Sequence, residues 1–467
     1  MRWSFLSGLL LATLVLCGTR SIFASDGKAD LPPPAPPKDA SDLGRGIQRT
    51  MTLLATSAPQ HRNHVRILFY GQSITEQEWS KQVAEDLRKR FPYADLEIEN
   101  RAIGGFAAQL LIRPAEHDLY PFYPDLLIFH VYGSNVEYEQ IIRNVRSRTT
   151  AEILMQKDHV TQWPPAVIDK EKDKGMWWDD LMNNRFLPDT AKKYGCGLAD
   201  VRSAWLDYLK TNRLEPKALL KDGVHLNADG NVLMSQLISR YLIYRPELAK
   251  AERNDTVRTL QVGKEVQWKE GKLSLSFEGN RVDLLPARHE GGLSDAAQVR
   301  IDGKKPSEFP ECYTIPRPQP GPWSPLALVR VDHPSPLQVE EWSLKLTEVR
   351  EEGKHWKYEV RGSLTGPDGN GDSEATFVSK SGRVRIEPDA FFRNPNVALP
   401  NGYEIRWHVL PMGMDVWTAP PIPDPSREYP MTLAQGLANT HHTLEISAAN
   451  GKQAPIRAIR IYRPPLQ

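Results

Sequence analysis

The sequence predicts an α/β fold with a parallel sheet, followed by a second region built from β-strands. Between His64 and about Tyr244, short apolar runs alternate with segments whose apolar residues recur at helical spacing. After about Asn254 this spacing gives way to short β-type runs, separated by turn signals such as Asp302-Gly303. Alternating strands and helices are typical of a parallel sheet covered on both faces. We therefore expect a three-layer αβα domain with a flavodoxin-like strand order.

The first 24 residues are predicted to be a secretory signal peptide. Arg2 precedes an apolar run from Phe5 to Cys17, and Ile22-Phe23-Ala24 provides a cleavage site after Ala24. The run is too short for a permanent membrane anchor, and no later segment is long and apolar enough to cross a bilayer. We expect a secreted or periplasmic protein without stable membrane insertion. Residues 25–60 include Leu31-Pro32-Pro33-Pro34 and are predicted to be a proline-rich linker.

Residues 61–250 are predicted to form the α/β domain. The first strand is apolar and aromatic-rich, begins near Val65 and ends at Gly71. The helix after it has apolar residues at helical spacing, namely Trp79, Val83, Leu87 and Phe91. The other predicted strands are 96–103, 125–132, 151–156 and 197–201. The other predicted helices are 137–146, 180–194 and 230–241.

Residues 254–467 are predicted to form an all-β sandwich or jelly roll, with or without an inserted β unit around 320–420. The β-type runs are 273–277, 298–301, 326–331, 342–347, 356–362, 375–378, 384–386, 403–409, 443–446 and 456–462.

Length and composition narrow the classes of function. A chain of 467 residues is expected to form two or three domains. Its 59 Lys+Arg against 58 Asp+Glu leave a net charge of +1, which gives no basic surplus for nucleic acid. Once Cys17 leaves with the signal, Cys196 and Cys312 remain, and we expect buried thiols rather than a disulfide scaffold.

A serine stands where the first predicted strand ends, in Gly71-Gln72-Ser73. Ligands of open α/β sheets bind outside the carboxyl ends of the strands, so Ser73 is placed where a nucleophile would act. A serine hydroxyl needs an imidazole to take its proton, and the imidazole needs an acceptor at its other nitrogen. Asp222-Gly223-Val224-His225 precedes the last predicted helix, and an Asp and a His three residues apart on one turn can meet side by side.

Two further residues follow strands and have the chemistry of an oxyanion hole. Gly105 follows the second predicted strand, and Asn135 follows the third. The N–H groups of Ser73 and Gly105 and the Asn135 amide would supply three donors to a negatively charged oxygen. Taken singly, Gly104-Gly105 is also typical of a turn, Asn135 of a helix cap, and Asp222-x-x-His225 of a solvated loop.

Together and in order, Ser73, Gly105, Asn135 and Asp222-x-x-His225 resemble the SGNH (GDSL-type) hydrolases. The resemblance covers about 180 residues and does not extend to the β region. It implies Ser73 as nucleophile, Gly105 and Asn135 as oxyanion donors, and Asp222 and His225 as the rest of a triad. The chain departs from the family at Gln72, where the first block usually has Asp. Gly-Gln-Ser occurs in related carbohydrate esterases, so we expect a local rearrangement and retained activity.

Together with the predicted signal peptide and the β region, the resemblance predicts a secreted serine esterase that hydrolyses short-chain esters, above all acetyl esters, on a carbohydrate. Its substrate would be a small-molecule or polysaccharide ester, with no nucleic-acid partner and no cofactor or metal. Two alternatives stay open: an O-acyltransferase with the same site, and a catalytically inactive glycan-binding protein. The sequence does not define the oligomeric state.

Several other motifs have a structural and a functional interpretation. The tryptophans of residues 163–180 suit either sugar stacking or the anchoring of a long loop. Asp158-His159 suits a structural pair better than a substrate contact. Residues 368–379 lack the glycine and glutamate of a calcium loop, which favours a hairpin turn. His441-His442 lacks zinc-like partners. Five tryptophans of the β region would form either a carbohydrate platform or core: Trp323, Trp342, Trp356, Trp407 and Trp417.

Overall fold

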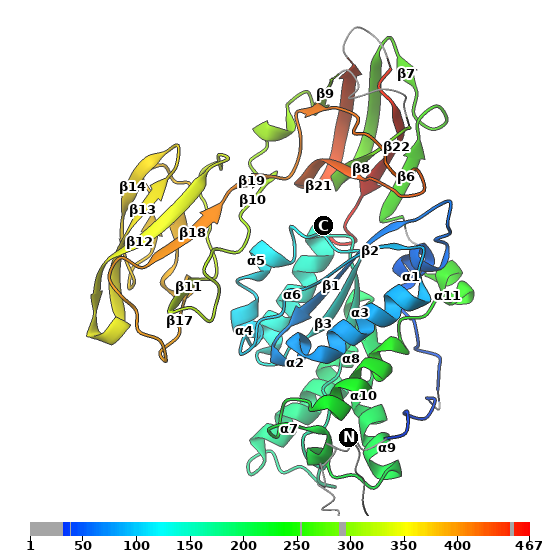
Figure 1. Ribbon diagram of the computed structural model, residues 1–467, viewed down its shortest axis with the longest axis vertical. Coiled ribbons are helices and arrows are strands. Elements are labelled where there is room, and N and C mark those ends of the chain that lie inside the picture. Colours follow the sequence, from blue (N-terminus) through cyan, green and yellow to red (C-terminus); the bar gives the residue numbers. More distant parts are fainter. Residues whose placement is uncertain (1–30, 38, 253–254, 289–295, 449–452) are drawn as a thin grey trace, which may run out of the picture. The chain divides into compact units, whose positions relative to one another are not determined.

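Five parallel strands form the sheet of the α/β domain in the computed structural model, which describes residues 31–37, 39–252, 255–288, 296–448 and 453–467 (Figure 1). The strands are β1 (His64–Gly71), β2 (Asp95–Asn100), β3 (Leu126–His130), β4 (Glu152–Gln156) and β5 (Gly197–Ala199). They are ordered β2-β1-β3-β4-β5, the flavodoxin-like order expected from the sequence. The predicted signal peptide lies outside the described residues.

Helices cover both faces of this sheet. They are α2 (Ser73–Glu76), α3 (Glu78–Arg90), α4 (Ala108–Leu111), α5 (Ala115–Asp118), α6 (Asn135–Arg148), α7 (Lys174–Leu181), α8 (Leu187–Tyr194), α9 (Val201–Thr211), α10 (Ala228–Ser239) and α11 (Pro246–Ala251). A π-helical turn, Met182–Phe186, joins α7 to α8. Leu68 and Tyr70 of β1 share a core with α6 and α8, whereas Phe69 packs against Trp79 of α3. Successive strand residues point to opposite faces, so α3 and α6 lie on different sides of the sheet.

A helix occupies part of the segment predicted to be a linker. This helix, α1 (Gln48–Ala55), follows Ile47, and the side chains of Ile47, Met51 and Leu54 are buried. The backbone N–H groups of Arg49 and Thr50 donate to the Glu152 carboxylate on β4 at 2.8 and 2.7 Å. The apolar residues at spacing i, i+4 and i+7 are the helical signal that the neighbouring prolines obscured. This corrects the linker prediction for its second half.

The strands that begin and end the β region form one antiparallel sheet. They are β6 (Val257–Gln261), β7 (Trp268–Lys269), β8 (Lys272–Pro286), β9 (Ala297–Ile301), β20 (Val416–Trp417), β21 (Met431–Ala448) and β22 (Ile456–Tyr462). The order is β20-β9-β21-β8-β22-β6, with β7 also paired to β8. Hydrogen bonds join all seven strands, so the expected β domain is present, and its assignment as a sandwich or jelly roll stays a prediction. At Gly279 in β8 a Cβ would overlap the Tyr462 carbonyl, so only glycine allows the close approach of β22 there.

The chain between β9 and β20 carries a smaller β unit with its own core, which we call the inserted unit (residues 302–415). Its strands are β10 (Tyr313–Thr314), β11 (Leu326–Leu328), β12 (Glu341–Arg350), β13 (His355–Gly362), β14 (Gly366–Asp372), β15 (Phe377–Val378), β16 (Arg385–Ile386), β17 (Phe391–Arg393), β18 (Glu404–His408) and β19 (Leu410–Pro411). Four of them form the sheet β14-β13-β12-β18. Trp342 and Trp407 stack in the core, with ring centroids 6.3 Å apart.

Buried polar contacts attach the inserted unit to the α/β domain. His117 on α5 contacts the Ile315 carbonyl through Nδ1 at 2.7 Å and accepts the Val331 N–H at Nε2, at 3.1 Å. The adjacent Asp118 forms a bidentate ion pair with Arg317. Ala327 and Val329 of the inserted unit are buried in the core of the α/β domain.

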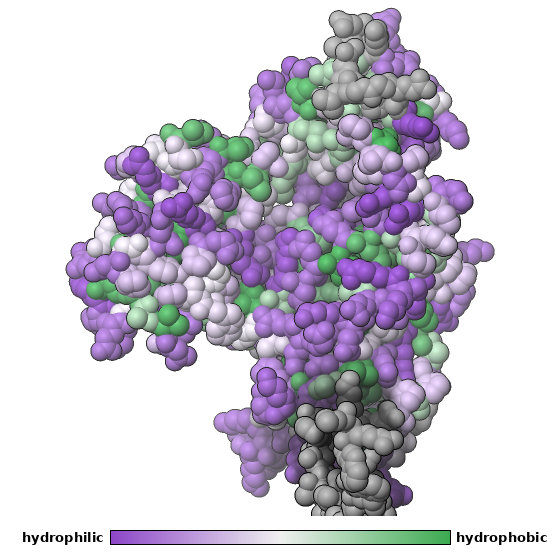
Figure 2. All heavy atoms as spheres, viewed as in Figure 1, coloured by the Kyte–Doolittle hydropathy of each residue, from purple (hydrophilic) through white to green (hydrophobic). Residues whose placement is uncertain are grey.

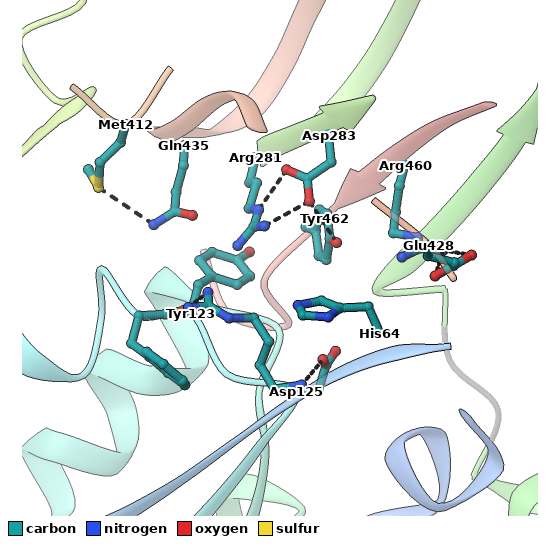
Figure 3. A network of polar contacts seen from close by, with 12 residues as sticks. His64, Tyr123, Asp125, Arg281, Asp283, Met412, Glu428, Gln435, Arg460 and Tyr462 are labelled. Carbon is teal, nitrogen blue, oxygen red and sulfur yellow. Dashed lines mark hydrogen bonds and ion pairs between the residues drawn. The ribbon is translucent and has the colours of Figure 1, made fainter. Parts of the chain in front are cut away.

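A second polar network joins the α/β domain to the seven-stranded sheet (Figure 3). Arg281 pairs with Asp283 on β8 at 2.7 Å, and the Tyr462 hydroxyl donates to the same carboxylate at 3.0 Å. The Arg281 guanidinium also lies 4.8 Å from the ring centre of Tyr123, which follows α5. Every charge named here has a partner, so this network is structural.

The outer face and the cysteines agree with the composition. Hydrophilic side chains dominate the face in Figure 2, where apolar residues form small, separate patches. Cys196 and Cys312 are buried free thiols, as expected. In the ranges that the structure describes, no helix has the length and apolar character to cross a bilayer.

Candidate active site

Ser73 is the first residue of α2 and stands at the carboxyl end of β1. The turn before it is tight, because a Cβ at Gly71 would overlap the backbone carbonyl of His130 on β3. The N–H groups of Thr75 and Glu76 donate to the Gln72 carbonyl at 2.8 and 3.2 Å, which starts the helix immediately. The sheet edge and this turn hold the Ser73 side chain at the position expected for a ligand site.

Three side chains that are distant in the sequence form a continuous hydrogen-bonded chain. His225 Nε2 lies 2.9 Å from Ser73 Oγ, and His225 Nδ1 lies 2.9 Å from Oδ2 of Asp222. Because Nδ1 faces a carboxylate, that nitrogen carries the proton, and Nε2 is left to accept the serine proton. The arrangement can generate a serine nucleophile.

The Asp222 carboxylate also organises the loop that carries the histidine. Its Oδ1 accepts the backbone N–H of His225 at 2.9 Å and that of Val224 at 3.3 Å. The backbone hydrogen bond from His225, followed by that from its ring, lowers the pKa of Asp222 to about 2. The carboxylate is therefore ionised at neutral pH and can stabilise an imidazolium. The spacing of three residues is explained by this turn, in which Gly223 has φ +86°.

The loop is held against α3 by a side chain that sequence reasoning missed. Gln77, just before α3, donates from Nε2 to the Leu226 carbonyl at 3.0 Å and accepts the Leu226 N–H at Oε1, at 3.1 Å. The amide satisfies both backbone groups of the residue after His225, and so sets the distance between the imidazole and Ser73. The sequence feature that could have indicated this contact is a glutamine four residues after the candidate nucleophile Ser73.

His159 also holds the loop that carries His225. Its Nε2 donates to the Val224 carbonyl at 2.8 Å, and its ring packs at 5.4 Å from that of Trp205. Burial lowers the pKa of His159 to about 4, so the ring is neutral at physiological pH. The neighbouring Asp158 pairs with the buried His130. Burial is the largest single effect and raises the pKa of Asp158, but the hydrogen bonds from His130 and Asn183 and the charge interactions with His130 and His159 together outweigh it, so the net shift is downward. Asp158 and His159 therefore serve structure, as the sequence favoured.

Gly105 and Asn135 lie at the same edge of the sheet as Ser73. Gly105 follows β2 with φ +78°, and a Cβ on the preceding Gly104 would lie 3.5 Å from Ser73 Cβ. Asn135 is the first residue of α6, which follows β3, and among the described residues its Oδ1 is buried without a hydrogen-bond partner.

Gln72 is buried where the resemblance leads one to expect an acid. Its side chain lies beside the Tyr132 hydroxyl, and its Nε2 finds no hydrogen-bond partner among the described residues. A neutral amide avoids placing a charge at this buried position, because an unpaired carboxylate there would be costly.

The other candidate motifs have structural partners. His442 pairs with Asp302 at 2.7 Å and contacts the Ala438 carbonyl at 2.9 Å. The Asp368 carboxylate accepts the backbone N–H of Ser381 at 2.9 Å and the Ser381 hydroxyl at 2.6 Å. In the part of the chain that the structure describes, no three His, Cys, Asp or Glu side chains gather as a metal site.

No protein-family model matches the chain, and no curated protein matches it. Similar solved structures include a two-domain esterase active on acetylated mannans, with 14% identity, coverage of 90% of this chain and 96% of that chain, and a TM-score of 0.37. The match to an acetylxylan esterase from Geobacillus stearothermophilus has 17% identity and a TM-score of 0.34. It covers 40% of this chain and 97% of that chain. The match to an alpha/beta hydrolase from the metagenome of Lake Arreo, Spain, has 16% identity and a TM-score of 0.33. It covers 40% of this chain and 98% of that chain. The interpretation of the site depends on the distances above.

Proposed function

We propose that this protein is a secreted serine esterase of SGNH type that removes short acyl groups, above all acetyl, from a carbohydrate. The observation that carries the proposal is the chain of 2.9 Å contacts from Ser73 Oγ through His225 to Asp222. The carbohydrate and the export rest on the Gly71-Gln72-Ser73 block and the N-terminal signal in the sequence.

The reaction proceeds through an acyl-enzyme. His225 Nε2 takes the proton of Ser73 as Oγ attacks the ester carbonyl, and Asp222 stabilises the imidazolium. The N–H groups of Ser73 and Gly105 and the Asn135 amide stabilise the oxyanion of the tetrahedral intermediate. His225 then gives its proton to the departing sugar oxygen. A water molecule, deprotonated by His225, attacks the acyl group, and the carboxylic acid leaves as Ser73 recovers its proton.

The exposure of the site suits a large substrate. The side chains of His225 and Asp222 are 36% and 48% exposed, and Ser73 is half-buried, so the site can be reached from solvent. An acyl group that projects from a polysaccharide can reach such a site without the whole polymer entering a cavity.

The test is the release of acetate from acetylated glycans by wild type and by Ser73→Ala. We expect the variant to be at least about 10³-fold slower, because the nucleophile is lost. The matched control is Ser147→Ala on α6, since this serine is also half-buried and donates only to the Asn144 carbonyl among the described contacts. Equal rates for wild type and Ser73→Ala would reject the mechanism.

Two further measurements separate the alternatives. In the first, a sugar acceptor is added to the reaction. If the acceptor becomes acylated and acetate is not released, the protein is an acyltransferase. A fluorophosphonate that fails to label Ser73, with glycan binding retained, identifies an inactive binding protein.

A further inference from the structure

We infer that Trp323 of the inserted unit forms a stacking platform for the sugar ring that carries the ester. The inference rests on the proposed function and names the group that recognises its substrate. Trp323 is 58% exposed, whereas the other four tryptophans considered for a platform are at most 6% exposed: Trp342, Trp356, Trp407 and Trp417. A large aromatic side chain left in solvent beside a reactive site needs an explanation that core packing does not supply.

The indole lies directly beside the candidate oxyanion hole. A Cβ added to Gly105 would lie 3.3 Å from Cη2 and 3.6 Å from Cζ2 of Trp323, so the six-membered ring approaches the glycine backbone. The adjacent Gly104 lies against the first turn of α2, since its added Cβ would lie 2.6 Å from Oε2 of Glu76 and 3.5 Å from Ser73 Cβ. Gly104 and Gly105 therefore separate the indole from the nucleophile, and the Glu76 carboxylate lies beside them.

Aromatic contacts from both domains hold the indole in place. Trp323 meets Phe392 edge to face, with centroids 6.3 Å apart and planes at 87°. Phe392, on β17, packs at 4.7 Å against Phe106, which is fully buried in the α/β domain. The side-chain amide of Asn394 donates to the Trp323 carbonyl at 3.1 Å. The ring is therefore oriented before a ligand arrives, which lowers the entropic cost of stacking.

The segment that carries Trp323 is attached on both sides. Arg317 pairs with Asp118 six residues before it, and Ala327 and Val329 enter the core of the α/β domain after it. Arg113 also binds Asp389 close to β17. These contacts make the inserted unit part of the active site, although the residues of the triad come only from the α/β domain.

The chemistry of this platform fits a saccharide ester. The apolar C–H face of a pyranose stacks on an aromatic face, while its hydroxyl groups stay in water and its acyl group extends over Gly105 towards Ser73. Stacking tolerates different hydroxyl patterns, so the platform would accept several acetylated sugars. A small ester without a ring would gain nothing from it.

The test compares two substrates in each variant. The kcat/KM of Trp323→Ala and Trp323→Phe is measured with acetylated xylooligosaccharides and with ethyl acetate. We expect the ratio of the two values to fall at least about tenfold in Trp323→Ala, mainly through KM, and less in Trp323→Phe. The matched control is Tyr93→Ala, an exposed aromatic residue just before β2, at the opposite edge of the sheet from Ser73.

A binding measurement makes the result independent of catalysis. Calorimetric titration of acetylated xylooligosaccharides into Ser73→Ala and into Ser73→Ala with Trp323→Ala should show at least about tenfold weaker binding in the double variant. A ratio of kcat/KM values within twofold of wild type, or equal binding by the two variants, overturns the inference. Either result leaves the esterase proposal intact as long as ethyl acetate hydrolysis still requires Ser73.

Discussion

Acidification should weaken the attachment of the inserted unit, because His117 is buried at its junction with the α/β domain as a neutral imidazole. The side chain is 5% exposed. Its Nδ1 donates to the Ile315 carbonyl at 2.7 Å, and its Nε2 accepts the Val331 N–H at 3.1 Å. A proton on Nε2 would turn this acceptor into a donor facing another donor, and would place a positive charge in the interior.

The expected effect on stability follows from the pKa of this group. Burial lowers the pKa of His117 from 6.5 to about 4. Between these values the unfolded chain binds more protons than the native protein, so the free energy of unfolding falls as the pH falls. The contribution is fully present above pH 6.5 and is lost as the pH decreases towards 4. At pH 5 the linkage equation gives a loss of about 2 kcal/mol relative to pH 7.5.

Urea unfolding of wild type and His117→Asn at pH 7.5 and pH 5.0 isolates this contribution. Asparagine retains an N–H donor for the Ile315 carbonyl and does not titrate. The stability advantage of wild type over the variant should shrink by about 2 kcal/mol at the lower pH. The same advantage at both pH values would refute the reasoning. His408→Asn is the control, because this histidine is exposed on β18 of the same unit.

Two predictions concern the geometry around Ser73. Asn135→Ala should lower kcat for p-nitrophenyl acetate about 10²- to 10³-fold with a smaller change in KM, as the loss of one oxyanion donor does; an unchanged kcat would remove Asn135 from the mechanism. Gln77→Met should lower kcat at least about tenfold, because the Leu226 N–H loses its partner, the Leu226 carbonyl keeps only the Asn231 amide at 3.3 Å, and His225 is held less firmly. Glu78→Gln, at the exposed start of α3, is the control, and equal losses in both variants would contradict the role of Gln77.

The central sheet and the local chemistry of the site could be predicted because both depend on short stretches of sequence. The apolar runs before Gly71 and Gly133 define strands, and alternation with helices leads to a parallel sheet whose carboxyl ends meet at one edge. The Asp222–His225 contact lies within a single turn, so its spacing is visible in the sequence. Ser73 and His225, by contrast, are 152 positions apart, and their contact was inferred from the resemblance.

The prediction failed where a weak local signal is stabilised by distant residues. Nothing near α1 in the sequence shows that its N–H groups bind Glu152, about a hundred positions away, and the prolines before it favoured a linker. The β runs themselves were expected, but the pairing of β8 with β21 was not predicted, because it joins residues far apart in the chain.

The sequence by itself determined which residues carry the chemistry: a serine at a strand end, a histidine with its aspartate on one turn, and glycine where the backbone must approach closely. Only the tertiary structure decided how they are held and what lies beside them. The clamp of Gln77 on Leu226 and the exposure of Trp323 beside Gly105 depend on contacts between segments that no local pattern connects. The physical reason is that burial and hydrogen bonding belong to the surroundings of a side chain, and the surroundings exist only after the chain has folded.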